Sequence, residues 1–288
     1  MIVVTGATGV LGRLVVDRLL ELVPAAEVGV SVRDTARAQD LADRGVRVRQ
    51  GDFTAPDTLA DAFAGAEQVL VVSANTLGPD GVAQHRAAID AAVAAGARRV
   101  LYTAHQGARV DSPFAAAADH AATEEILAAA GIAWTSLRNG FYANTVPMFL
   151  ADAATTGELR LPDDGPVAWT TREDLATATA RLLVDGAPDG PTAPLTGPEA
   201  VDFEQVATLV GDLTGRPVRR VVVEPAEYRE TLLGRGVPAP AADLLLGFFP
   251  AAARGDFAPA DPTLAELAGR PATPIADVLR ASLAPATS

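Results

Sequence analysis

The segment that most constrains this fold is the first strand of the chain and the turn after it. Residues 2–4 form a short β-branched run, and Thr5-Gly6-Ala7-Thr8-Gly9-Val10-Leu11-Gly12 follows directly. Apolar residues then recur at helical spacing over residues 11–23. A glycine-rich turn between strand and helix brings backbone amides to the positive end of a helix, where a pyrophosphate binds well. The segment therefore predicts a dinucleotide-binding unit, with a ligand-free glycine-rich turn as the alternative.

Each glycine of this turn has an expected role. Gly6 permits the tight turn, Gly9 lets the backbone approach the pyrophosphate, and Gly12 allows the helix to pack closely on the sheet. The spacing is G-x-x-G-x-x-G, not the G-x-G-x-x-G of many dehydrogenases. The loop residues that we expect to contact the cofactor are Gly6, Ala7, Thr8, Gly9, Val10 and Leu11.

Strand and helix signals alternate through the first half of the chain. The later strands are expected at residues 27–32, 46–50, 67–73, 98–103 and 132–137, and the helices at 35–44, 56–64, 82–95 and 116–130. Such alternation is typical of parallel strands joined by crossover helices. We therefore expect an α/β fold with a doubly wound parallel sheet, the NAD(P)-binding Rossmann fold.

After Arg138 the alternation breaks. We expect helices at 147–156, 172–185 and 203–214, short strands at 158–161, 167–170 and 218–223, and an apolar helical stretch at 243–250. Residues 1–138 are expected to form the dinucleotide-binding domain. Residues 139–288 are expected to form mainly a smaller, substrate-binding α/β region, with some elements returning to the sheet. The apolar residues 244–249 either roof the substrate site or belong to a core helix.

Composition and charge exclude several kinds of function. The chain has no cysteine, so disulfides, zinc–thiolate sites and thiol nucleophiles are excluded. Its three histidines are too scattered to indicate a metal site. The net charge of −13 argues against nucleic acid or an anionic membrane as a partner. No apolar run approaches the roughly 20 residues of a membrane span, and no basic leader precedes the first strand. We expect a cytoplasmic protein.

The end of the second strand bears on the choice of dinucleotide. An NAD enzyme usually offers an acidic residue there to the ribose 2′-hydroxyl, but this chain has Val32 followed by Arg33. An arginine can hydrogen-bond a 2′-phosphate and cover the adenine. Asp34 is better placed to begin the next helix. The sequence therefore favours NADP(H) over NAD(H), the alternative being that Arg33 is a solvated loop charge.

Residues after the third, fourth and fifth strands complete the expected cofactor site. Asp52 is expected to accept from the adenine amino group and Phe53 to line the same cleft, unless Asp52 only starts a turn. Residues at the same sheet edge are expected to lead toward the nicotinamide: Ser73, Ala74, Asn75, Thr103 and Ala104.

The catalytic pair of ordinary ketone reductases is missing. In short-chain dehydrogenases, a lysine four residues after a tyrosine lowers the pKa of that tyrosine, which gives the proton. Here all 23 basic residues are arginine, and the tyrosines are Tyr102, Tyr142 and Tyr228. Either the protein is no catalyst, or its reaction does not depend on that donor. Hydride transfer to a quinone is such a reaction, because the acceptor is strongly electrophilic.

The chain resembles the NmrA-like, atypical short-chain dehydrogenase/reductases, and among them the type 2 NADPH:quinone oxidoreductases of bacteria. The resemblance covers nearly the whole chain and is carried by the glycine turn and by Ser31-Val32-Arg33-Asp34, Gly51-Asp52-Phe53, Gln84-His85-Arg86, Ala118-Asp119-His120, Thr123-Glu124 and Arg138-Asn139-Gly140-Phe141-Tyr142. It implies NADPH bound across the strand edge, with Asn139, Gly140 and Phe141 near the nicotinamide and the quinone.

One segment departs from that family, and it bears on catalysis. Relatives often carry serine and aliphatic residues where this chain reads Ala104-His105-Gln106-Gly107. His105 is a candidate proton donor or a bystander. His120 either orients substrate or holds local structure, and Tyr142 either closes over the nicotinamide or packs in the core.

The leading hypothesis is an NADPH-dependent oxidoreductase that transfers a hydride to a quinone or a similar conjugated carbonyl acceptor. One alternative is a redox-sensing regulator that binds NADP without turnover. Another is a tailoring reductase of an aromatic natural product. The sequence does not indicate the oligomeric state.

Overall fold

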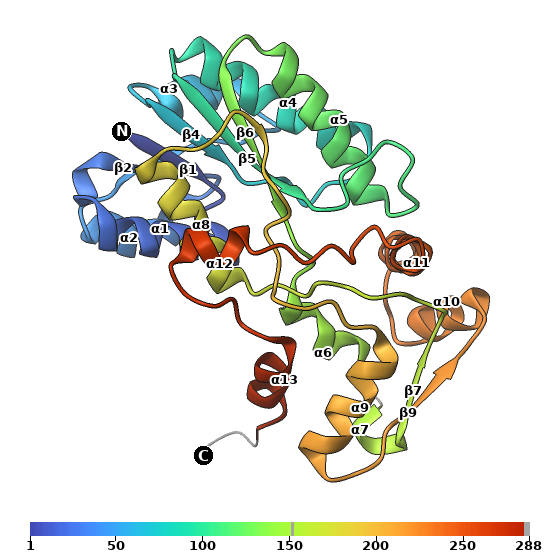
Figure 1. Ribbon diagram of the computed structural model, residues 1–288. Coiled ribbons are helices and arrows are strands. Elements are labelled where there is room, and N and C mark those ends of the chain that lie inside the picture. The colour runs from blue at the N-terminus through green and yellow to red at the C-terminus, as the bar shows by residue number, and fades with distance from the viewer. Residues whose placement is uncertain (151–152, 285–288) are drawn as a thin grey trace.

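A seven-stranded parallel sheet organises the molecule, with strand order β3-β2-β1-β4-β5-β6-β8 (Figure 1). The computed structural model describes residues 1–150 and 153–284. The strands are β1 (Ile2–Thr5), β2 (Val28–Val32), β3 (Arg47–Gln50), β4 (Gln68–Val71), β5 (Arg99–His105), β6 (Ala133–Asn139) and β8 (Gly190–Pro191). The order reverses between β1 and β4, which is where open α/β sheets bind their ligands. The expected doubly wound sheet is confirmed.

Helices cover both faces of this sheet. They include α1 (Val10–Leu22), α2 (Gln39–Asp43), α3 (Leu59–Phe63), α4 (Pro79–Ala94), α5 (Ala115–Ala129) and α8 (Arg172–Asp185). β1 and β2 are buried throughout, as parallel strands covered on both faces must be. One core layer joins α1, β1 and β2 to α8, so an element from the second half of the chain lies on the dinucleotide-binding half (Figure 1).

The remaining elements gather below the carboxyl edge of the sheet. A parallel pair, β7 (Glu158–Leu161) with β9 (Arg219–Val222), lies there beside α9 (Phe203–Thr214) and α10 (Pro225–Gly234) (Figure 1). The other helices are α6 (Val146–Phe149), α7 (Ala153–Thr156), α11 (Ala239–Ala253), α12 (Thr263–Ala268) and α13 (Ile275–Leu283). α12 packs in the layer of α1 and α8 through Leu264. The other elements share a strongly aromatic core, in which Trp169, Phe203, Phe248 and Phe249 are almost fully buried.

Most sequence-based boundaries agree with the structure within two residues. α4 begins three residues before the start expected at residue 82, and α11 extends beyond the stretch expected at 243–250 at both ends. Three further differences concern the elements themselves. β8 was not expected, because a two-residue strand of glycine and proline carries no β-branched signal. Residues 167–170 were expected as a strand, but only isolated bridges form, between Val167 and Val201 and between Tyr142 and Thr170. The helix expected over 147–156 is divided into α6 and α7, and part of it falls outside the described residues. The division of the chain at residue 138 stays a prediction.

Candidate active site

The glycine turn, residues 5–12, is a tight backbone turn that leads into α1. Gly6 has φ of +63°, which a glycine adopts without strain, and its carbonyl accepts from the Gly9 amide at 2.9 Å. A Cβ on Gly12 would stand 2.4 Å from the Gly6 oxygen. Gly12 therefore lets the helix approach the turn itself, which is more specific than the packing on the sheet that we expected.

The first turn of α1 has amides that an anion can use. No side chain in the described structure caps this helix at Gly9, and its first turn holds no acidic residue. Uncapped helix amides carry the positive end of the helix dipole. The side chains of Ala7 and Leu11 point into the core, whereas Val10 is exposed. Among the loop residues that we expect to contact the cofactor, Ala7 and Leu11 can therefore do so only through their backbone atoms.

At the end of β2, Arg33 is exposed and its guanidinium makes no hydrogen bond or ion pair within the described residues. Asp34 accepts from the Ala36 amide at 3.0 Å and caps the following turn, as expected. The cation next to β2 is therefore not neutralised by its sequence neighbour.

Asp52, after β3, is already engaged in a turn. Its Oδ1 accepts from the Thr54 amide at 2.9 Å and from the Thr54 hydroxyl at 2.8 Å. These bonds lower the pKa of Asp52, and the charge of Arg33 lowers it further. The geometry thus supports the turn-forming alternative, while contacts of Asp52 and Phe53 with adenine stay predictions.

The loop after β4 is held by side chains from three other elements. Thr103 accepts from the Ser73 amide at 2.8 Å, and His85 Nε2 accepts from the Ala74 amide at 2.9 Å. Asp119 accepts from the Gly78 amide at 2.7 Å. Asn75 at the tip is exposed. These bonds fix the backbone of Ser73–Ala74–Asn75 at the same edge as the glycine turn.

Two of the three histidines meet on one buried tyrosine. The Tyr102 hydroxyl lies 2.7 Å from His120 Nδ1 and 3.3 Å from His85 Nδ1. Burial lowers the pKa of His85 to about 4 and lowers that of His120 well below its usual value. Burial also raises the pKa of Tyr102. His120 is thus tied into local structure, which supports the structural alternative for this residue.

His105 and Asn139 end two neighbouring strands as partners in the register of β5 and β6. His105 Nε2 and both polar atoms of the Asn139 amide are buried without a hydrogen-bond partner of good geometry in the described structure. Buried polar groups are nearly always paired, and exceptions need an explanation. A bound ligand with matching donors and acceptors would supply one.

The residues at the end of β6 and just after it have structural roles that explain their identities. Arg138 Nε and Nη2 donate to Glu124 at 3.0 and 2.7 Å, joining β6 to α5. A Cβ on Gly140 would stand 2.1 Å from the hydroxyl oxygen of Thr170. These contacts hold Asn139 at the end of its strand.

Tyr142 packs against the protein and does not stand free as a lid. Its ring joins the core beside α1 and α8, and the Arg172 guanidinium lies 4.5 Å from the ring centroid. Burial raises the pKa of its hydroxyl, while Arg172 and the nearby Asn139 amide lower it to a smaller extent. The arrangement supports the packing alternative over the lid.

Residues 244–249 lie within α11, and Phe248 and Phe249 are buried in the aromatic core. A Cβ on Gly247 would stand 2.4 Å from the Pro113 oxygen, so α11 rests directly on the loop before α5. This supports the core-helix alternative.

Two hollows on the surface of the described residues lie away from this edge. One, of about 680 Å³, runs between α3 and α4, and the other, of about 190 Å³, lies beside β7 and α10. No group of metal-ligating side chains occurs in the part of the chain that is described. No helix among residues 1–150 and 153–284 is long and apolar enough to span a membrane.

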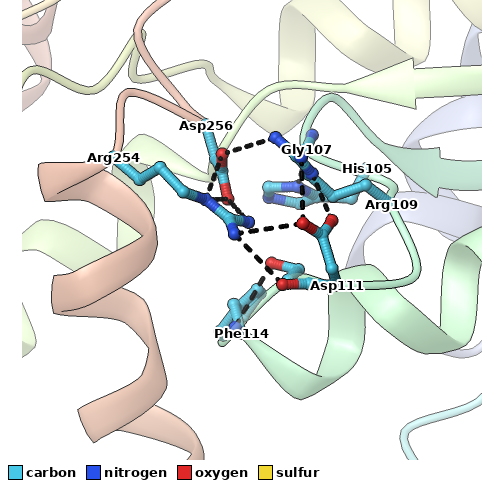
Figure 2. Close-up of polar contacts among 8 residues, drawn as sticks. His105, Gly107, Arg109, Asp111, Phe114, Arg254 and Asp256 are labelled. Atoms are coloured by element: carbon cyan, nitrogen blue, oxygen red, sulfur yellow. Dashed lines mark hydrogen bonds and ion pairs between the residues drawn. The ribbon is translucent and has the colours of Figure 1, made fainter.

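Sequence reasoning missed the aromatic and charged residues that surround His105. Phe257, Arg254 and Asp256 come from the loop after α11, about 150 positions further along the chain. Figure 2 shows Arg254 and Asp256 beside the loop that follows His105. No motif precedes them, and their role depends on tertiary packing alone. Gly107 was a partial signal, because a Cβ there would stand 2.8 Å from the Phe257 ring.

Comparison with known proteins places this geometry in a family. The NmrA-like family matches residues 1–266. The chain is 35% identical to quinone oxidoreductase 2 of Escherichia coli strain K12 over 281 residues, covering 96% of each chain. It is 32% identical to an NAD(P)H azoreductase of Xenophilus azovorans, covering 99% of this chain and 98% of that one.

Solved structures agree. The NADPH-dependent quinone oxidoreductase of Escherichia coli complexed with NADPH superposes with a TM-score of 0.93 and 34% identity, covering 99% of this chain and 100% of that one. Triphenylmethane reductase of Citrobacter sp. complexed with NADP(H) superposes with a TM-score of 0.90 and 31% identity, covering 98% of this chain and 100% of that one. The resemblance stated from the sequence is confirmed, and the chain belongs to the NmrA-like family.

Proposed function

We propose that this protein is an NADPH-dependent oxidoreductase that reduces a quinone or a related conjugated carbonyl compound by hydride transfer. The observation that carries the proposal is the set of unpaired polar atoms of His105 and Asn139 at the edge that also bears the glycine turn. When bound there, NADPH would supply the hydride. Relatives named for the reduction of quinones and azo compounds support the same chemistry.

The residues fit a dinucleotide along the whole edge. The uncapped amides at the start of α1 suit the pyrophosphate. The free guanidinium of Arg33 suits a 2′-phosphate, since arginine binds phosphate oxygens with paired donors. The Asn139 amide has one donor group and one acceptor, and so complements the carboxamide of a nicotinamide. Further along the edge, we propose contacts to the same cofactor from Thr103, Ala104, Gly140 and Phe141.

The groups at the site suit an acceptor that needs no strong acid. The chain has no lysine, and the hydroxyl of Tyr102 is buried against His120. Burial raises the pKa of Tyr142, which makes its phenol a weak acid. A quinone meets these conditions, because its reduced oxygen is a weak base that water can protonate.

The proposed setting is the cytoplasm, with a small-molecule acceptor and no nucleic-acid partner. The net charge of −13 supports this, because polyanions would be repelled. Fractionation of the cells that make the protein, followed by immunoblotting, would contradict the proposal if the protein sedimented with membranes.

The central test mixes the protein with NADPH and a panel of quinones, enones and simple ketones, and follows the absorbance of reduced nicotinamide. We expect oxidation with quinones, slower oxidation with enones and none with simple ketones. NADH and protein-free mixtures serve as controls. Tight binding of NADPH without oxidation by any acceptor would overturn the enzyme proposal and favour a dinucleotide-sensing regulator.

A further inference from the structure

His105 lies at the meeting point of aromatic side chains that come from distant parts of the chain. Its ring centroid is 5.1 Å from that of Phe257, 5.4 Å from Phe141 and 5.7 Å from Phe114. The His120 ring is stacked at 6.4 Å, almost parallel. We call these four residues the aromatic enclosure. They come from the loops after β6 and α11, from the loop before α5 and from α5 itself, so the enclosure exists only in the folded protein.

The backbone fixes which ring nitrogen of His105 carries the proton. The Gly107 amide donates to His105 Nδ1 at 3.1 Å, so Nδ1 is the acceptor (Figure 2). In a neutral imidazole the other nitrogen must then be the donor. Nε2 is buried and has no partner in the described structure. His105 therefore presents an unused N–H group inside the enclosure.

The surroundings keep His105 neutral and hold it still. Burial lowers its pKa to about 4, against a smaller opposite effect of the Asp256 carboxylate. His120 beside it is itself held neutral by burial. The charged side chains at the enclosure rim are two cations, Arg109 and Arg254, and two anions, Asp111 and Asp256, so their charges balance within the cluster (Figure 2).

The same cluster fastens the walls of the enclosure. Arg254 donates to Asp256 at 2.6 Å and to the Asp111 carbonyl at 3.1 Å, so it ties the loop after α11 to the loop after β5 (Figure 2). Gln106 Nε2 donates to the Phe257 carbonyl at 2.8 Å. The donor and the rings are thus positioned before any ligand binds, which is what electrostatic catalysis requires.

We propose that His105 is a catalytic residue that donates a hydrogen bond from Nε2 to the acceptor oxygen on which negative charge develops. This inference rests on the proposed function. The acceptor takes up a hydride with two electrons, its carbonyl π bond breaks, and the oxygen gains a negative charge. Water then protonates the oxygen, so His105 keeps its own proton throughout. A planar aromatic acceptor matches the aromatic side chains around His105, against which its ring would pack.

This role differs from that of a proton donor. A neutral imidazole is a poor acid, but a fixed N–H group in a dry site stabilises a developing oxyanion strongly. Removal of one such donor costs about a hundredfold in kcat in well-studied enzymes. We expect a loss of that order when Nε2 is removed, with little change in the affinity for NADPH.

Two amide substitutions separate catalysis from structure. His105→Gln puts an amide N–H near the place of Nε2 and loses the acceptor for Gly107. His105→Asn keeps an acceptor near Nδ1 for Gly107 and lacks a donor at Nε2. His105→Phe keeps only the ring. We expect His105→Gln to retain most of kcat, and His105→Asn and His105→Phe to lose about a hundredfold each. Retained activity in His105→Asn with loss in His105→Gln would show a structural role and overturn the inference.

A second measurement reports the tautomer and the contact directly. The chain has three histidines, so ¹⁵N labelling of histidine gives a simple NMR spectrum. With NADP⁺ and a phenolate product analogue, we expect the Nε2–H signal of His105 to shift while Nδ1 remains unprotonated. An unshifted signal would overturn the inference. If the wild-type protein and His105→Phe oxidise NADPH equally well, the inference about His105 is wrong but the proposed function stands. If the wild-type protein oxidises NADPH with no acceptor, the proposed function is wrong as well.

Discussion

Substitution of Gly140 by alanine tests how the residues after β6 are held in place. A Cβ at this position would stand 2.1 Å from the Thr170 hydroxyl oxygen, 3.0 Å from Thr170 Cβ and 3.1 Å from the Ala168 carbonyl oxygen. The backbone cannot retreat easily, because the Gly140 amide donates to the Leu195 carbonyl at 2.8 Å. The side chain of Thr170 must therefore move.

The cost follows from what Thr170 gives up. Its hydroxyl donates to the Ala168 carbonyl at 3.0 Å and accepts from the Gly197 amide at 2.9 Å. Overpacking costs about 1–3 kcal/mol, and a buried amide left unpaired costs about 1–3 kcal/mol. We expect Gly140→Ala to lower the free energy of unfolding by about 3–5 kcal/mol, within the range of these two effects together.

A double-mutant cycle isolates this clash. Thr170→Ala alone should cost about 1–3 kcal/mol, because it leaves the Gly197 amide unpaired. In the double variant the closest clash is absent, so its loss should be smaller than the sum of the two single losses by about 1–3 kcal/mol. Urea unfolding followed by tryptophan fluorescence, to which Trp134 and the buried Trp169 both contribute, gives all three values. Additivity within about 0.5 kcal/mol would refute the reasoning.

Three further predictions concern the cofactor, the ion pair and pH. Arg33→Ala should weaken NADPH binding at least tenfold more than NADH binding, because only NADPH carries the 2′-phosphate, and equal losses by titration would contradict this. Glu124→Gln should lower the free energy of unfolding by about 1–3 kcal/mol, since the partly buried Arg138 keeps its charge and loses its carboxylate partner; an unchanged urea midpoint would contradict it. His85 and His105 have folded pKa values of about 4, below the unfolded value of about 6.5. Each histidine therefore contributes up to about 3 kcal/mol of stability that is fully present above pH 6.5 and is lost as the pH falls toward 4. The free energy of unfolding, measured from pH 7 to pH 4, should fall accordingly. A constant value would contradict the lowered pKa values of the two histidines.

The features that sequence reasoning predicted well depend on local patterns. The glycine turn, the β-branched runs and helices such as α8 and α9 each carry their signal within a few neighbouring residues. The capping box at Asp202 and Gln205 is one such signal. Because crossover helices force parallel strands, these local features also fixed the sheet.

The features that it missed depend on contacts between distant segments. Phe257 reaches His105 only because α11 packs on the loop before α5. The two-residue strand β8 exists because β6 offers it a partner. The sequence left a structural and a ligand-binding role open for both Asp52 and His120. The hydrogen bonds of Asp52 to Thr54 and of His120 to Tyr102 support the structural role in both cases. Choosing between such roles requires the three-dimensional structure.

The measurement that tests the central claim most directly is a single turnover with NADPH deuterated at C4. Wild-type protein is loaded in separate experiments with each of the two C4-deuterated epimers and mixed with a quinone, and the oxidation of nicotinamide is followed by rapid mixing. A site that binds the cofactor in a single orientation offers only one face of the nicotinamide to the acceptor, so we expect a primary isotope effect from one epimer only. Equal slowing by both epimers, or oxidation with no isotope effect from either, would contradict hydride transfer at this site.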